Sequence, residues 1–134
     1  MGQKVNPIGF RLGIIKGWES NWYGGKEFAD KLIEDQEIRK YVHARLPKGG
    51  ISKIIIERTL KRITLTVHTA RPGVIIGSKG ANIEKITKTL NKITSRNILI
   101  KIKEIKKPEA DANVVAQNIA RQLKGRAAFR RVLK

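Results

Sequence analysis

The 134-residue chain has the length of one ordinary domain, and its 29 Lys and Arg against 11 Asp and Glu give a formal net charge of +18 at pH 7. No apolar run approaches the roughly 20 residues that span a bilayer, the lack of cysteine excludes disulfides and thiolate metal sites, and the first residues have no apolar signal-peptide core. We therefore expect a cytoplasmic protein without a membrane partner, whose surface attracts polyanions, with nucleic acid as the first partner to consider.

The positive charge is concentrated in the last two-thirds of the chain. Residues 1–25 carry three basic residues and one acidic residue, residues 26–46 carry five of each, and residues 47–134 carry 21 basic and five acidic residues. We expect the surface that meets a polyanion to lie after residue 46, and the neutral segment to face away from it.

Residues 1–25 show no sustained period of 2 or 3.6, and they contain six of the twelve glycines and both tryptophans. We interpret this segment as an extended arm that a partner surface orders. Its aromatic residues Trp18, Trp22 and Tyr23 suit either stacking on nucleic-acid bases or packing against the domain's own core, and the pattern leaves both open.

The pattern of residues 26–46 predicts a helix with a break near Asp35. Its apolar residues keep to one broad side: Phe28, Leu32, Ile38, Val42 and Leu46. Its carboxylates alternate with basic residues and are interpreted as a charge-balanced solvent face rather than a two-metal nuclease site: Glu27, Asp30, Glu34, Asp35 and Glu37.

Two strands are predicted next, over residues 51–58 and 62–69, joined by a hairpin turn. In the second strand Ile63, Leu65 and Val67 alternate with polar residues, which indicates that one face is buried. Residues 81–92 then read as a helix, and residues 98–104 form a third alternating strand whose isoleucines point inward: Ile98, Ile100 and Ile102.

Pro108 opens a last predicted helix, with Val115, Ile119 and Leu123 on its apolar side. The predicted fold is therefore α+β: a three-stranded sheet with helices packed on one face, plus the extended N-terminal arm. We divide the chain into an arm (1–25), a core domain (26–107) and a basic C-terminal helix (108–134).

The stretch GVIIGSKGANI, residues 73–83, places Gly77 and Gly80 around a serine and a lysine. Helical apolar residues on both sides indicate a loop between two short helices. Glycine lets the backbone approach a ligand closely, the following helix N-terminus favours an anion, and Lys79 adds a charge. This combination predicts a clamp for the phosphate backbone of a nucleic acid rather than a reader of bases. A Walker loop and a dinucleotide fingerprint are both excluded, because the required Gly-Lys-Ser/Thr sequence is missing and position 75 is isoleucine.

This stretch resembles the core of KH domains, whose pattern is V-I-I-G-x-x-G-x-x-I, and the preceding helix and strand resemble the type II arrangement. In addition, GQKVNPIGFRLGI, HTARPGVIIG, KPEADA and FRRVLK resemble the bacterial-type ribosomal protein S-three family of the small subunit, from the first residue to the last. That family continues with a second α/β domain, so the chain is expected to be cut short, and it often has a lysine where this chain has Ser78.

The resemblance implies a structural protein of the small-subunit head that binds small-subunit rRNA, neighbouring head proteins and mRNA at the channel through which mRNA enters. The RNA-binding candidates are Gly77, Ser78, Lys79, Gly80, Lys85, Lys88, Arg71, Lys4 and Arg11, and those near mRNA are Arg130, Arg131 and Lys134. A KH module of a transcription-elongation or ribosome-assembly factor is the alternative, although such modules lack the arm.

A nucleic-acid-processing enzyme is a third possibility, and the sequence does not favour it. His43 and His68 are the only histidines, and they form no triad or metal-ligand pattern. We therefore expect no catalytic residue, no metal, no cofactor and no small-molecule substrate.

Overall fold

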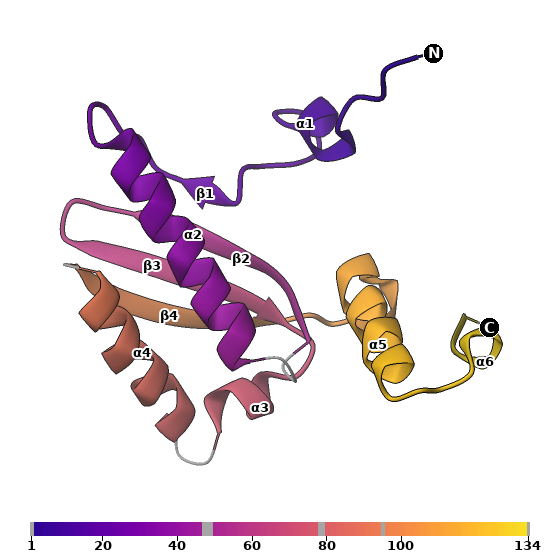
Figure 1. The fold of residues 1–134 in the computed structure, drawn as a ribbon. Coiled ribbons are helices and arrows are strands. Elements are labelled where there is room, and N and C mark those ends of the chain that lie inside the picture. Colours follow the sequence, from indigo (N-terminus) through magenta and orange to yellow (C-terminus); the bar gives the residue numbers. More distant parts are fainter. Residues whose placement is uncertain (1, 47–49, 78–79, 95, 134) are drawn as a thin grey trace.

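The computed structural model describes residues 2–46, 50–77, 80–94 and 96–133 (Figure 1). In chain order the elements are α1 (Pro7–Arg11), β1 (Ser20–Asn21), α2 (Phe28–Arg45), β2 (Ile51–Arg58), β3 (Arg62–Thr69), α3 (Pro72–Ile76), α4 (Ala81–Ile93), β4 (Asn97–Glu104), α5 (Ala112–Lys124) and α6 (Phe129–Leu133). The predicted helices within residues 26–46 and 81–92, the hairpin, and the two helices on either side of the glycine stretch are confirmed. The three segment boundaries stay a prediction.

The sheet has four strands in the order β1-β2-β3-β4, so the expectation of three strands is corrected. β2 and β3 form the antiparallel hairpin, and β4 lies parallel to β3. The additional strand, β1, comes from the arm and lies parallel to β2, with Ser20 opposite Ile56. The Ile56 amide also donates to the Glu19 carbonyl at 2.8 Å. Part of the arm is thus ordered by the domain itself, through the free backbone groups at the edge of β2.

The arm contains a second ordered element that was not predicted. Helix α1 begins after Asn6, whose side chain accepts hydrogen bonds from the amides of Ile8 and Gly9. Asn6 followed by Pro7 at the first helical position is a strong helix start. The predicted extended arm therefore contains a five-residue helix, and most of its side chains are exposed.

One face of the sheet carries the core, and α2 and α4 lie across that face (Figure 1). The alternating residues of β3 and the inward Ile98 of β4 are buried as predicted, and they pack against Ile38, Val42, Ile75, Ile86 and Leu90 from the helices. Each such side chain contributes roughly 1.5–3 kcal/mol when it leaves water. This core fixes α3 and α4, which carry the glycine stretch between them.

Helix α2 differs from the prediction at Asp35. The helix is continuous there, and Asp35 is only 2% exposed, so it does not belong to a solvent face. Its carboxylate accepts hydrogen bonds from Ser20 and Trp22 of the arm and from Arg58 of β2. A buried carboxylate needs such partners because burial penalises an unpaired charge.

The C-terminal segment is two helices rather than one. After a 3₁₀ turn at Pro108–Ala110, α5 begins at the cap residue Asp111 and ends at Gly125, and α6 follows. Val114, not Val115, is the buried residue of α5. The Asp111 side chain accepts from the amides of Asn113 and Val114, and it also accepts from the Ser52 hydroxyl at 2.5 Å. This cap joins α5 to β2.

Candidate nucleic-acid interface

The glycine stretch lies between two core-anchored helices. Helix α3 ends at Gly77 and α4 starts after Gly80, and both glycines have positive φ angles, 69° and 80°. Gly77, with ψ −178°, adopts a conformation that is open essentially to glycine alone. Gly80, with ψ 4°, has the left-handed conformation that Asn and Asp also tolerate. Ser78 and Lys79 lie outside the described residues.

Gly77 also lacks room for a side chain. A Cβ atom there would lie 2.6 Å from the side-chain nitrogen of Asn82, whereas a Cβ on Gly80 would meet nothing within 4 Å. The Asn82 amide donates to the Val74 carbonyl at 3.4 Å and so connects the start of α4 to α3. Sequence reasoning missed Asn82; its position in the first turn after the second glycine was the available signal.

The start of α4 is suited to an anion. Its N-terminal cap residue is Gly80, which has no side chain with which to cap the leading amides. The unpaired amides and the helix dipole at such an end favour a negatively charged ligand. Because Ile75 and Ile86 are buried on either side, the two helices that present this end are held by the core.

Basic side chains flank the glycine stretch on both sides. Lys85 and Lys88 lie exposed on α4, and Arg71 is exposed at the start of the five-residue helix α3. None of the three forms an ion pair with another residue in the described ranges. Lys85 and Lys88 thus lie on the helix that follows Gly80, whereas Arg71 lies at the other end of α3 from Gly77 and lines a hollow with Pro108 and Arg121.

Comparison with known proteins agrees with this geometry. Residues 37–110, which include the glycine stretch and β2 to β4, match the sequence profile of the KH domain. The chain belongs to the KH domain family. The described KH region has the topology helix, hairpin, helix, helix, strand, in agreement with the type II expectation.

Over all 134 residues the chain is also similar to curated ribosomal proteins. It is 66% identical to the small ribosomal subunit protein uS3 of Cytophaga hutchinsonii, covering 53% of that protein. It is 60% identical to uS3 of Parabacteroides distasonis, covering 55%, and 58% identical to uS3 of Flavobacterium johnsoniae, covering 53%. The chain therefore spans about half the length of the curated relatives it matches.

The remaining predicted contacts lie apart from the KH glycine stretch. Lys4 and Arg11 belong to the arm, at the opposite end of the molecule from α3 and α4 (Figure 1). The Arg11 guanidinium donates to the Pro7 carbonyl at 2.9 Å within α1. The structure therefore does not join these two cations to the region around Gly77 and Gly80.

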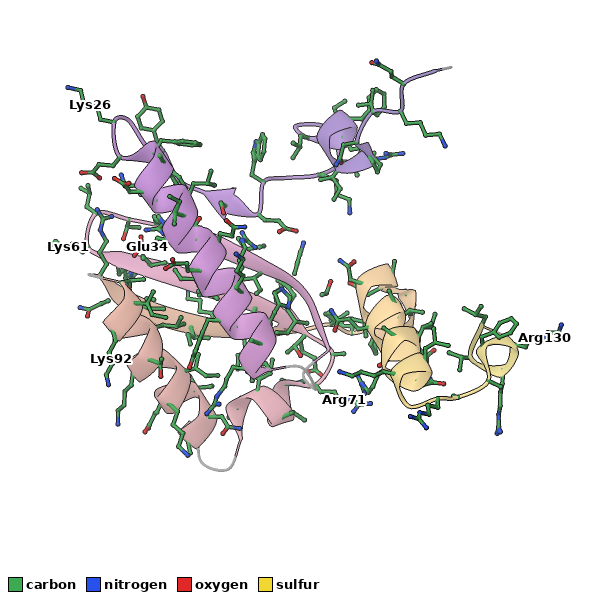
Figure 2. All side chains as sticks on the ribbon, viewed as in Figure 1. Lys26, Glu34, Lys61, Arg71, Lys92 and Arg130 are labelled. Carbon is green, nitrogen blue, oxygen red and sulfur yellow. The ribbon has the colours of Figure 1, made fainter. Side chains whose placement is uncertain are left out.

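Arg130 and Arg131 are exposed on α6, beyond α5 from the sheet (Figure 2). The guanidinium of Arg130 lies 5.9 Å from the centre of the Phe129 ring, a cation–π contact. Lys134 lies outside the described residues. The sequence from 112 to 134 contains no acidic residue, and neither arginine forms an ion pair in the ranges that the structure describes.

The two histidines of the KH region do not form a chemical site. His43 is exposed on α2, and His68 is half-buried on β3. Burial, together with the nearby charges of Lys53 and Lys103, lowers the pKa of His68. Within the ranges that the structure describes, no three His, Asp or Glu side chains group so that they could hold a metal ion. Nor is any described helix both long and apolar enough to span a membrane.

Proposed function

We propose that this chain is a structural RNA-binding part of the small ribosomal subunit in the cytoplasm, where its KH domain contacts small-subunit rRNA. The observation that carries the proposal is the 66% identity to a curated uS3 along all 134 residues. That likeness includes the arm of residues 1–25, which a KH module of another RNA factor does not need. This role requires no catalytic residue, cofactor or small-molecule substrate.

The binding mechanism follows from the glycine stretch. Gly77 and Gly80 let the backbone approach a sugar-phosphate strand, and the leading amides of α4 donate to its phosphates. Lys79 lies in the loop itself and Ser78 is its polar neighbour, while Arg71, Lys85 and Lys88 supply charge on both sides. Each phosphate contact releases counterions, so affinity falls as salt rises, by about 0.7 log units per tenfold salt for each contact to a single strand.

The arm and the C-terminal helices extend the proposal to further partners. Lys4 and Arg11 contact rRNA or neighbouring head proteins. The support for a partner at the arm is that its apolar side chains are exposed: Val5, Ile8, Phe10, Ile14 and Ile15. Arg130, Arg131 and Lys134 contact mRNA where it enters the subunit. This contact is supported by the absence of acidic residues from the sequence after Asp111.

The clamp is tested by a matched pair at Gly80. Asn and Asp tolerate the φ of 80° at this position, and a Cβ there has open space, so Gly80→Asn and Gly80→Asp differ mainly in charge. Binding to a small-subunit rRNA fragment is measured by fluorescence anisotropy. We expect Gly80→Asp to weaken binding about tenfold relative to Gly80→Asn. Equal affinities of the two variants for the rRNA fragment would refute the proposed phosphate clamp.

The ribosomal role needs a separate measurement. The tagged chain is expressed in a bacterium, and its position is followed in a sucrose gradient together with its cross-links to RNA. We expect it with the small subunit, cross-linked to small-subunit rRNA. A chain found only with transcription complexes or with immature particles would instead identify an elongation or assembly factor.

A further inference from the structure

A basic hollow lies at the end of the sheet away from the glycine stretch. It has a volume of about 980 Å³ and is lined by the β2–β3 turn, by Arg96 after α4, and by the segment before α2. We call it the hairpin hollow and define it by Tyr23, Leu60, Lys61, Arg62 and Arg96. Its volume is in the range of small-ligand sites, roughly 300–1,000 Å³.

Three of the cations around the hairpin hollow are uncompensated. Lys31 and Arg58 also line it, but Lys31 pairs with Glu27 at 3.0 Å and Arg58 is occupied by carboxylates of α2. Lys61, Arg62 and Arg96 form no ion pair in the part of the chain that the structure describes. Glu27 is the only acidic residue among the described lining residues. The hollow therefore carries a net positive charge.

Because Glu27 is paired with Lys31, its negative charge offsets little of the remaining positive charge of the hollow. The hydrogen bond from Lys31 and the charge of the same lysine lower the pKa of Glu27, with a smaller contribution from Arg96. The carboxylate is thus already engaged by Lys31. An anion that enters the hollow meets three free cations and no free carboxylate among the described lining residues.

An aromatic side chain stands at the rim of the hollow. Tyr23 is 93% exposed, so its ring covers no core of its own. Its backbone is nevertheless held, because the neighbouring Trp22 donates to the buried Asp35 at 2.7 Å and packs against Phe28 at 5.4 Å between ring centres. A fixed backbone beneath a free aromatic ring fits a platform on which a nucleobase stacks.

Helix α4 connects the glycine stretch to the hollow. Lys85, Lys88 and Lys92 lie exposed on one side of α4, whose 13 residues span about 20 Å. Lys92 and Lys61 lie at the same end of the sheet, as Figure 2 shows. The neighbouring hollow between α2 and the end of α4 shares Lys31, Arg58 and Arg96 with the hairpin hollow, and it adds the acidic residues Asp30, Glu34 and Glu37. A polyanion is therefore favoured on the hairpin side of Arg96, where Lys61 and Arg62 lie, rather than over the carboxylates of α2.

We propose that the hairpin hollow is a second RNA subsite, in which Lys61, Arg62 and Arg96 bind a phosphate and Tyr23 stacks on a base of a single strand. The proposal rests on the proposed function, since the strand reaches the hollow from the loop of Gly77–Gly80 along the lysines of α4. At a stacked spacing of about 3.4 Å, the 20 Å along α4 corresponds to about six nucleotides.

The test uses fluorescein-labelled oligouridines of two lengths, measured by anisotropy at low salt. An oligomer of about four nucleotides occupies only the glycine loop, whereas one of about ten also reaches the hollow. Lys61→Glu and Tyr23→Ala are compared with Lys40→Glu, a matched charge reversal of an exposed lysine on α2. Circular dichroism checks that each variant is folded.

We expect Lys61→Glu and Tyr23→Ala each to weaken binding of the longer oligomer at least about fivefold, and to leave the shorter one within about twofold. Lys61→Glu should also reduce the salt slope for the longer oligomer by about 0.7. The subsite is refuted if either variant behaves like Lys40→Glu on the longer oligomer. In that case an effect of Gly80→Asp on the shorter oligomer would still support the glycine-loop clamp, so the two failures can be told apart.

Discussion

The buried carboxylate of Asp35 makes the sharpest stability prediction. The side chains of Asp35 and Arg58 are each 3% exposed, and both the Nε and an Nη of Arg58 donate to Asp35. The other Asp35 oxygen accepts from the Ser20 hydroxyl at 2.9 Å and from the Trp22 indole at 2.7 Å. Asp35→Asn keeps the size of the side chain but removes its charge and one acceptor.

The expected loss of unfolding free energy is about 3–5 kcal/mol, the usual cost of leaving one partner of a buried ion pair uncompensated. The value should fall toward the lower end, because Glu34 still pairs with the same guanidinium. Domains of this size have about 5–15 kcal/mol in total, so the loss is a large fraction. The arm should also loosen, since Ser20 and Trp22 lose their acceptor.

Urea unfolding at pH 7, followed by circular dichroism, measures the loss, and limited proteolysis follows the arm. Glu37→Gln is the control on the same helix, where the exposed side chain should change stability by less than about 0.5 kcal/mol. If Asp35→Asn does not fold, the double variant Asp35→Leu with Arg58→Met should recover a folded protein, because it removes both charges. A loss below about 1 kcal/mol for Asp35→Asn would show that the ion pair does not hold this region together.

Two further predictions concern the glycine stretch and the cap of α5. Gly77→Ala should lower the free energy of unfolding by about 3 kcal/mol and Gly80→Ala by about 1 kcal/mol, because only Gly77 combines a glycine-only conformation with a blocked Cβ position. Urea unfolding measures both values, and equal losses for the two variants would contradict this reasoning. Asp111→Ala should cost about 1 kcal/mol at pH 7 through the lost cap. The hydrogen bond from the Ser52 hydroxyl lowers the pKa of Asp111 from 3.8. The wild type should therefore lose its extra free energy of unfolding, relative to Asp111→Ala, as the pH falls below 3.8. If that difference in free energy persisted at lower pH, it would be inconsistent with the cap.

The core of the fold was predictable because its signals are local. In β3 a strict alternation places Ile63, Leu65 and Val67 on one face, and the structure buries all three. The helix–loop–helix was equally readable, since glycine spacing and apolar flanks lie within eleven residues. Period and turn chemistry describe neighbours along the chain, and these elements are decided by such neighbours.

The errors at Asp35 and at β1 arise from contacts between distant residues. Asp35 was interpreted as solvent-facing because charged side chains usually are, but its partner Arg58 lies 23 residues away and no local pattern announces the pair. Strand β1 consists of Ser20 and Asn21, which have little preference for strands, and it forms because the edge of β2 offers unpaired backbone groups. The break after α5 follows from Gly125, which was read as part of one helix.

The same distinction applies to the two proposed RNA contacts. The glycine loop is contiguous, so its residue types and spacing were enough to predict it, apart from Asn82. The hairpin hollow draws Tyr23, Lys61 and Arg96 from three separate segments, and no local pattern brings them together, although the sequence left base stacking open for Tyr23. Asp35 holds Trp22, the residue beside Tyr23, so the carboxylate that sequence reasoning misread also helps to fix the backbone at Tyr23. Because Asp35 was assigned to the solvent face, sequence reasoning missed how the arm is attached to the domain. It missed the proposed second RNA contact because the residues of that hollow come from three segments.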